Sequence, residues 1–331
     1  MAYTTIDNPE LFFQVKIWTG TGSSQALTLD GDEDMAPDYV AIKERSGTQQ
    51  WNVYDSIRGV QKYLGWNTTG QEATQSQGLT AFGSDGFTVG TDDMVNGNTK
   101  TYAGICWVES ATSGFDIVTF TGNQTARTIS HSLSAKPEWL WIKNREKVES
   151  WHMQHGALGA TQTAETNTAN AFGSGSTIWN DTEPTTSVFS VGNNGNINET
   201  GSDIITYLWA GKQGYSKFGK YIGNADANGP FIYLGFRPAM FIYKCSDTNG
   251  EEWKILDNKR DPFNRGSARN IILHANTAES DDTNSIGEFV SNGVKIRSAH
   301  NNINKSGSTF VYMAFAESPF VNSKKIPTNA R

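Results

Sequence analysis

Apolar residues in this chain recur in short runs and not at helical spacing. Phe13, Val15 and Ile17 alternate with polar neighbours, which is the period-two pattern of a half-buried strand. Turn-forming residues interrupt such runs roughly every ten positions, as in proteins built from many short strands. The pattern predicts an all-β chain of the antiparallel sandwich or jelly-roll type.

The clearest predicted element is a strand that begins at a proline and ends at a lysine. It occurs three times, at Pro37–Lys43, Pro137–Lys143 and Pro238–Lys244, with the prolines 100 and 101 residues apart. The residues between proline and lysine are mainly apolar at successive positions, so we expect both faces of the strand to be buried. We predict a central strand, covered by its own core on one face and by a neighbouring domain on the other.

Two further features repeat with a similar spacing. A tryptophan strand follows each proline-opened strand, at Trp51, Trp151 and Trp253, and we expect these side chains to be buried. A last apolar strand lies around Tyr102, Tyr207 and Tyr312, each 105 residues from the next. A period of about a hundred residues has the size of a small domain and exceeds a solenoid unit.

These three repeated features predict three tandem domains, each an antiparallel β-sandwich of the jelly-roll type. The expected boundaries are an N-terminal arm at 1–11, repeats at 12–110, 114–213 and 214–319, and a C-terminal tail at 320–331. The joints between repeats are short, so the domains should pack closely. Polar ends of this length normally fray, and we expect at least one of them to be held by another chain.

Charge and cysteine content exclude several classes of protein. The net charge is -7 and charged residues make up 18% of the chain, without the basic stripe that nucleic-acid binding needs. Apolar runs are too short for membrane insertion. The first nine residues lack the basic and apolar segments of a signal peptide, which predicts synthesis in the cytoplasm. Cys106 and Cys245 stand at non-equivalent positions of different repeats, and we expect two reduced core thiols.

An acid and an arginine follow the tryptophan strand in two of the three repeats. Asp55 precedes Arg58 in repeat one, and Asp257 precedes Arg260 in repeat three. Repeat two has His155 in place of the acid and lacks the arginine as well. Because acid and arginine are present together or absent together, we expect an ion pair that fixes the turn. A catalytic acid is the alternative.

Metal and cofactor chemistry finds little support in the sequence. Asp30, Asp32 and Asp34 lie on a glycine turn and are weak candidates for a calcium site, since calcium binds clustered oxygens. A solvated acidic turn is the simpler interpretation. His152 and His155 would point to opposite faces of a strand, which disfavours a shared metal. The motifs of nucleotide loops and nucleophile elbows are missing, so we expect no cofactor and no catalytic residue.

Tryptophans are the remaining candidates for a binding surface. Trp139 and Trp141 share one face of a strand, and Trp66 lies nearby in repeat one. Exposed tryptophan faces stack on sugar rings in binding sites. Packing between neighbouring domains is the alternative.

Several longer motifs resemble a known family. They are Gly214–Gly223, Gly235–Ala239, Asp257–Phe263, Ser291–Arg297, Tyr312–Phe320 and Pro327–Arg331, joined in repeat two by Ile129–Leu133. Together they resemble a repeat domain of tailed-bacteriophage virion proteins, often of tail-fibre type, found especially in marine and cyanobacterial phages. The resemblance covers nearly the whole chain and is strongest from about residue 115 onward.

The resemblance implies a non-enzymatic structural protein on the surface of a tailed-phage virion, made in the bacterial host cytoplasm. A tail-associated fibre or receptor-binding role is the leading interpretation. A capsid decoration protein, such as a head fibre or knob, and a glycan-degrading tail enzyme are the alternatives. The implied partners are other virion proteins, sister subunits of a homo-oligomer with a trimer favoured, and a host surface glycan or receptor. The family supplies no catalytic residues.

Overall fold

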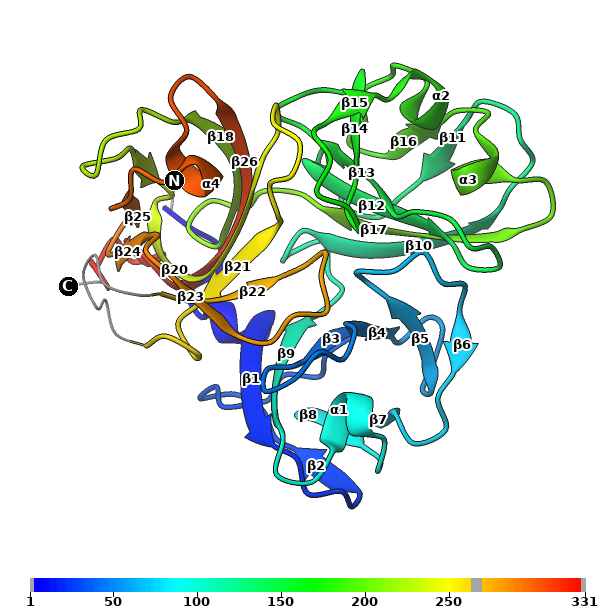
Figure 1. The fold of residues 1–331 in the computed structure, drawn as a ribbon, viewed down its shortest axis with the longest axis horizontal. Coiled ribbons are helices and arrows are strands. Elements are labelled where there is room, and N and C mark those ends of the chain that lie inside the picture. The colour runs from blue at the N-terminus through cyan, green and yellow to red at the C-terminus, as the bar shows by residue number, and fades with distance from the viewer. Residues whose placement is uncertain (1–2, 263–269, 329–331) are drawn as a thin grey trace.

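The computed structural model describes residues 3–262 and 270–328, and this part of the chain is all-β with several antiparallel sheets. Figure 1 shows three lobes around a common centre, coloured blue to cyan, green, and yellow to red along the chain. We call these lobes unit one (residues 13–107), unit two (115–209) and unit three (216–319). Every strand of a six-stranded sheet comes from a single unit.

Each unit contributes one six-stranded sheet. In spatial order, the sheet of unit one contains β1 (Phe13–Thr19), β9 (Thr101–Trp107), β3 (Tyr39–Glu44), β4 (Asn52–Asp55), β5 (Lys62–Gly65) and β6 (Ala73–Thr74). The sheet of unit two contains β10 (Phe115–Thr121), β17 (Asp203–Trp209), β12 (Trp139–Asn144), β13 (His152–His155), β14 (Gln162–Glu165) and β15 (Gly173–Ser174). The sheet of unit three contains β18 (Ser216–Ile222), β26 (Thr309–Pro319), β20 (Phe236–Cys245), β21 (Lys254–Asp257), β22 (Asn270–His274) and β23 (Asp282–Asn284).

A smaller sheet accompanies each large one. The small sheets are β2 (Gln25–Leu27) with β8 (Gly86–Val89) and β7 (Leu79–Gly83), β11 (Arg127–Ser130) with β16 (Val188–Val191), and β19 (Phe231–Tyr233) with β25 (Gly293–Ile296) and β24 (Gly287–Val290). The helices are single turns, namely η1 (Pro9–Leu11), α1 (Asp93–Asn96), α2 (Ser176–Trp179), α3 (Gly195–Asn198) and α4 (Asn301–Asn304). In the described residues, no helix is long and apolar enough to cross a membrane.

The three large sheets share one strand order. In each, the first strand pairs with the last, the last pairs with the proline-opened strand, and the tryptophan strand follows. Trp107, Trp209 and Phe315 hold the same register position, because each faces the first residue of the opening strand. The last apolar strand predicted around each tyrosine is confirmed, although the tyrosines stand at different register positions: Tyr102, Tyr207 and Tyr312.

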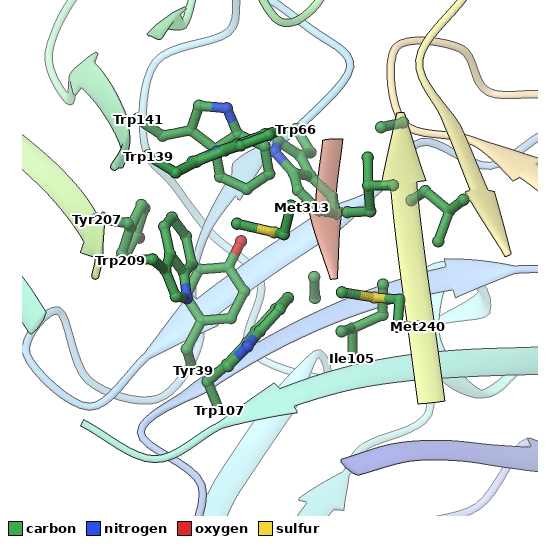
Figure 2. Close-up of a cluster of buried hydrophobic side chains, with 14 of the residues drawn as sticks. Tyr39, Trp66, Ile105, Trp107, Trp139, Trp141, Tyr207, Trp209, Met240 and Met313 are labelled. Atoms are coloured by element: carbon green, nitrogen blue, oxygen red, sulfur yellow. The ribbon is translucent and has the colours of Figure 1, made fainter. Parts of the chain in front are cut away.

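One face of each large sheet contributes to a single hydrophobic core that all three units share. The Trp107 ring centroid lies 5.6 Å from that of Trp209 and 5.5 Å from that of Phe315. Figure 2 shows side chains of the three units in contact at this centre. Trp51, Trp151 and Trp253 are buried in the same core, as the sequence predicted.

The opposite face of each large sheet is covered by the small sheet of its own unit, which forms a separate outer core. All six residues of β3, and all six of β12, are therefore buried. This arrangement confirms the predicted central strand with one face toward its own core and the other toward neighbouring repeats. Cys106 and Cys245 are buried free thiols, also as predicted.

The third proline departs from its predicted place. Pro37 and Pro137 each lie two residues before their strand, whereas Pro238 lies inside β20. The pairing of β20 with β26 shifts register on both sides of Pro238, which marks a bulge. Proline lacks an N–H and interrupts a ladder, so a bulge accommodates it within a strand. The expectation that Pro238 opens its strand is corrected accordingly.

The N-terminal arm folds back on its own chain. Ile6 is buried in the shared core, and the Tyr3 hydroxyl donates a hydrogen bond to the Gly235 carbonyl oxygen over 2.7 Å. The Phe12 ring packs edge-on against Tyr215, with centroids 6.1 Å apart. Residues 3–12 are therefore in contact with unit three and the shared core of the same chain. The expectation that another chain holds at least one of the two ends stays a prediction. Residues 1–2 of the arm and 329–331 of the tail lie outside the described residues.

Candidate functional site

The tryptophans expected at the surface are buried in the shared core. Trp66, Trp139 and Trp141 are each at most 1% exposed, and the Trp66 and Trp141 centroids are 4.6 Å apart across two units. Figure 2 labels all three together. The prediction of a surface aromatic site at these residues is wrong, and packing between repeats, the alternative, is confirmed. The physical reason is that β12 is covered on both faces.

The acidic turn does not form a cation site. Asp30 Oδ1 lies 2.5 Å from Lys16 Nζ, and the Asp30 amide donates a hydrogen bond to the side chain of Gln14. Across residues 3–262 and 270–328, no group of three or more His, Cys, Asp or Glu side chains is placed to hold a metal ion. The weak calcium candidates Asp30, Asp32 and Asp34 therefore remain an acidic turn.

The predicted acid–arginine pairs form in both units that carry them. Arg58 Nε lies 2.5 Å from Asp55 Oδ2, and Arg260 Nε lies 2.5 Å from Asp257 Oδ2, with these side chains at most 2% exposed. The Arg58 amide donates a further hydrogen bond to Asp55, and the Arg260 amide does so to Asp257. The ion-pair interpretation is therefore confirmed in both units, since each carboxylate is buried and hydrogen-bonded within its own turn.

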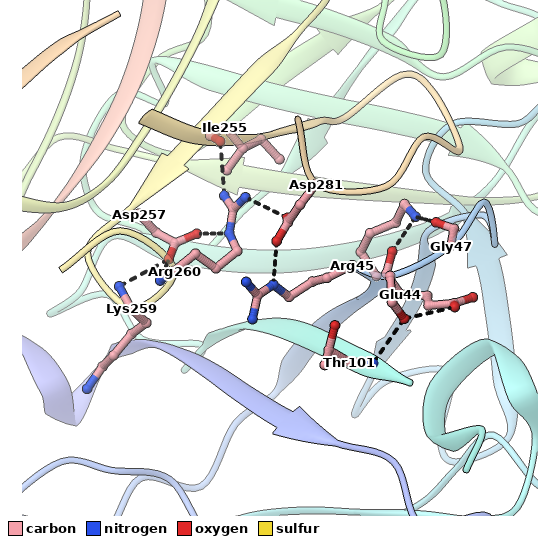
Figure 3. Close-up of polar contacts among 11 residues, drawn as sticks. Glu44, Arg45, Gly47, Thr101, Ile255, Asp257, Lys259, Arg260 and Asp281 are labelled. Carbon is pink, nitrogen blue, oxygen red and sulfur yellow. Dashed lines mark hydrogen bonds and ion pairs between the residues drawn. The ribbon is translucent and has the colours of Figure 1, made fainter. Parts of the chain in front are cut away.

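Each pair extends across the junction to the next unit. Arg260 Nη1 lies 3.3 Å from Asp281 Oδ1, and Asp281 Oδ2 lies 2.7 Å from Arg45 Nε of unit one (Figure 3). Units one and two are joined by a corresponding network, in which Glu72 of unit one pairs with two arginines. Glu72 Oε2 lies 3.6 Å from Arg58 Nη1 of unit one and 2.9 Å from Arg145 Nε of unit two. The ion pairs therefore join units as well as fixing turns.

The junction between units two and three replaces this network with uncharged residues. His155, Leu158, Phe172 and Ser246 hold the places of the four charged members, and the Phe172 ring lies 6.2 Å from Trp253. The Phe172 amide still donates to the Ser246 carbonyl oxygen over 2.9 Å, as the equivalent amides do at the other junctions. The acid and the arginine are both absent from unit two, and the two other positions of the network are uncharged as well.

Sequence reasoning missed half of each network. Arg45 and Arg145 each follow the strand-ending lysine by two residues, whereas repeat three has Ser246 there. This pattern was a readable signal, but the partner acids, Glu72 and Asp281, lie in neighbouring repeats. Only the fold reveals which repeat contributes the partner.

The three strand-ending lysines are fully buried, and their ammonium groups hydrogen-bond to backbone carbonyl oxygens of different segments. Lys143 Nζ donates hydrogen bonds to the carbonyl oxygens of Asn144 and Lys147 in its own unit, and to that of Thr69 in unit one. Lys244 likewise reaches the Ala169 carbonyl oxygen of unit two over 3.2 Å. Burial lowers the pKa of Lys43, Lys143 and Lys244 to about 8. Their surroundings indicate a structural role.

A cleft of about 340 Å³ opens where unit two, unit three and the N-terminal arm meet. Its walls include Tyr3 of the arm, Glu138 of unit two, the connecting residues 211–213, and Lys217 and Tyr233 of unit three. These stretches are far apart in the sequence, so no local motif marks the cleft. We refer to it as the junction cleft.

Tyr233 supplies an exposed aromatic ring to the junction cleft. Residues of β19 alternate between solvent and core, so Phe231 and Tyr233 are 47% and 50% exposed while Ile232 is buried. Lys217 Nζ donates a hydrogen bond to the Tyr233 carbonyl oxygen over 2.7 Å and lies 5.3 Å from the centre of its ring. Tyr3 is anchored next to it through Gly235. These contacts position Tyr233 while half of its side chain stays open to solvent.

Charged groups stand beside these rings. The Gly211 amide donates to Glu138 Oε2 over 3.1 Å. Burial raises the pKa of Glu138, against the lowering effects of that hydrogen bond and of Lys136 and Lys217. Burial also lowers the pKa of Lys212 and of Lys217. The cleft therefore offers a carboxylate acceptor and ammonium donors next to an aromatic surface.

This arrangement has the composition of a binding site for a small ligand. Glycoside hydrolysis generally uses two carboxyl groups on either side of the bond to be cleaved. Glu138 is the single carboxylate among the described residues that line the junction cleft. Aromatic surface with a few convergent polar groups is the usual composition of a small-ligand site.

Comparison with known proteins gives one family match. A family model described as "Domain of unknown function (DUF7483)" matches residues 8–319. No curated protein matches the chain. The matched range contains all three units in the described structure.

Proposed function

Because the chain belongs to the family described as domain of unknown function DUF7483, whose description states no activity, we propose a function from the residues themselves. The protein is a non-enzymatic structural protein on the surface of a tailed-phage virion. Its role is tail-associated, as part of the apparatus that attaches to the host. What supports this proposal is the resemblance of motifs over most of the chain to a repeat domain of phage virion proteins.

The architecture supports a structural role. Three units with one strand order share a single aromatic core, and charged or apolar groups join each unit to the next. The conspicuous buried carboxylates, Asp55 and Asp257, serve ion pairs and are not open to a substrate.

We further propose that the three units are diverged copies of one β-sandwich domain of about a hundred residues. The protein assembles with other virion proteins and with copies of itself, and a trimer is the favoured oligomer. Capsid decoration is the competing location. It predicts the same fold and differs in where the protein sits on the particle.

Immunogold electron microscopy of purified phage particles tests the proposal. Antibodies raised against the full chain should label the tail or its tip, and mass spectrometry of the same particles should detect the protein. Label on the capsid would replace the tail role with decoration. Absence of the protein from particles that are complete and infectious would contradict a virion role.

A further inference from the structure

We propose that the junction cleft binds an oligosaccharide of the host surface, an inference that rests on the attachment role proposed above. Sugar rings combine apolar C–H faces with hydroxyl groups, so a site for them needs aromatic surface beside hydrogen-bonding groups. The tryptophans that suggested such a surface from the sequence are buried. Tyr233 and Tyr3 line the junction cleft and provide aromatic surface at a different place.

Strand β19 adds a second exposed ring, that of Phe231, on the same strand face as the cleft-lining Tyr233. Phe231 and Tyr233 are two residues apart on β19, so their side chains project from the same face, about 7 Å apart along the strand. Both are about half exposed, whereas most large aromatic residues of the chain are buried. Burial of apolar surface normally stabilises the fold, so exposed rings of this size often mark an interaction site.

The polar part of the site is matched to hydroxyl groups. Glu138 accepts one hydrogen bond from Gly211 and keeps acceptor capacity, because an ionised carboxylate can accept about four. Lys217 donates one bond to the Tyr233 carbonyl oxygen and has two further N–H donors. Hydrogen bonds to charged groups are the stronger class, so Glu138, Lys212 and Lys217 would fix the orientation of a bound sugar.

Backbone geometry keeps the cleft open. Gly235 has a φ of +83°, a conformation that other residues rarely adopt, and a Cβ there would approach the Tyr3 hydroxyl to 2.5 Å. A side chain at Gly211 would collide with the Glu138 carboxylate. Glycine at both positions allows Tyr3 and Glu138 to border the same space.

Size and charge favour a sugar over a macromolecule. A volume of about 340 Å³ falls at the lower end of small-ligand sites, about 300–1,000 Å³, and would hold one or two sugar rings of a chain. The net charge of -7 opposes binding of a nucleic acid. A protein interface would need a contact area near 1,000 Å² or more, well beyond this cleft.

The test measures binding to oligosaccharides released by mild acid from the surface polysaccharide of the bacterium that the phage infects. Calorimetric titration would compare the full wild-type chain with Tyr233→Ala, the double variant Phe231→Ala/Tyr233→Ala, Glu138→Gln and Tyr233→Phe. Ile57→Ala is the matched control, because Ile57 is 51% exposed and lies in unit one, away from the cleft. Thermal unfolding of each variant verifies that it folds.

We expect wild type and Ile57→Ala to bind equally. Tyr233→Ala should weaken binding at least about ten-fold, which corresponds to 1.4 kcal/mol, and Tyr233→Phe should restore most of it because the ring remains. Glu138→Gln should also weaken binding. Folded wild-type protein that binds no oligosaccharide, or alanine variants that bind as well as wild type, would overturn the site.

The two proposals fail separately. If particle labelling shows the protein on the tail but the oligosaccharides do not bind, the site is wrong and the virion role stands. If Tyr233-dependent binding is measured for a protein that is absent from particles, the site stands and the virion role is wrong.

Discussion

Arg260 shows how one side chain can join two units. Its guanidinium group pairs with Asp257 in its own turn, donates to the Ile255 carbonyl oxygen over 2.9 Å, and reaches Asp281, which in turn binds Arg45 of unit one. Arg260 is buried, so its charge depends on these partners for solvation. Removal of one member of a buried ion network leaves the others uncompensated.

Replacement of Arg260 by methionine should therefore be strongly destabilising. We expect a loss of roughly 3–5 kcal/mol in the free energy of unfolding, since Asp257 would remain buried without its partner. Lys136→Ala is the control, because Lys136 pairs with Glu183 at the surface, where such a pair contributes about 0–1 kcal/mol. Urea denaturation of both variants gives the comparison, and equal losses would contradict the role assigned to Arg260.

Because His155 is buried and neutral, the folded protein should lose stability in mild acid. The Ala157 amide donates to its Nδ1, so Nε2–H donates to the Tyr312 carbonyl oxygen and the ring is neutral. Burial lowers the pKa of His155 to about 4, below its ordinary value of 6.5. The unfolded chain therefore takes up a proton between about pH 6.5 and 4 that the folded chain does not. Stability from this group is present above pH 6.5 and is lost as the pH falls through that window.

His155→Gln should reduce this acid sensitivity. The wild-type unfolding free energy should fall more steeply between pH 6.5 and 4, by up to about 1.4 kcal/mol per pH unit, which is one proton. The exposed His300 provides a control variant, His300→Gln, that should keep the wild-type slope. Identical slopes for wild type and His155→Gln would show that His155 does not carry the effect.

Individual residues were predictable where the partner was close in the sequence. Asp55 and Arg58 are three positions apart, so their pairing followed from the repeats alone. Glu72 and Arg145 are 73 positions apart, and nothing local connects them. Sequence also placed Trp139 on an apolar strand, but whether its face met solvent or another repeat depended on how the units pack.

At the level of elements, the junctions between units are of two kinds, one charged and one uncharged. Two junctions contain a charged network, and the third contains His155, Leu158, Phe172 and Ser246 at the same places. Buried ion pairs lose hydration on burial, and well-packed apolar groups of similar size are often equally stabilising. The four uncharged residues should therefore be able to replace a charged network at another junction without a large loss of stability.

A transplant tests this equivalence. The quadruple variant Arg45→Ser/Asp257→His/Arg260→Leu/Asp281→Phe moves the uncharged set to the junction of units three and one. We expect its unfolding free energy to stay within about 2 kcal/mol of wild type, while Arg260→Leu alone loses roughly 3–5 kcal/mol. A quadruple variant that is less stable than the single one would show that the junctions are not equivalent.

The strands themselves were largely predictable, because alternation and apolar runs are local. The proline-opened strands became β3, β12 and β20 at equivalent sheet positions. The bulge at Pro238 was not predictable, since it arises from pairing with β26. The junction cleft was equally hidden, because Phe231–Leu234 is a continuous apolar run in the sequence and only the fold shows that Phe231 and Tyr233 are exposed.

At the scale of the whole molecule, the shared core makes the stability of each unit depend on the other two. Each large sheet is apolar on both faces, and only the outer face is covered within its own unit. The inner face contains Trp107, Trp209 and their neighbours, which contact the other two units. A unit alone would expose this face to water. The three units should therefore unfold together in one transition.

Differential scanning calorimetry of the full chain tests this cooperativity most directly. For one shared core, a single transition is expected, with a ratio of calorimetric to van't Hoff enthalpy of about 1. Two or three resolved transitions, or a ratio of about 3, would show that the units unfold independently. That result would contradict the shared core as the basis of the fold.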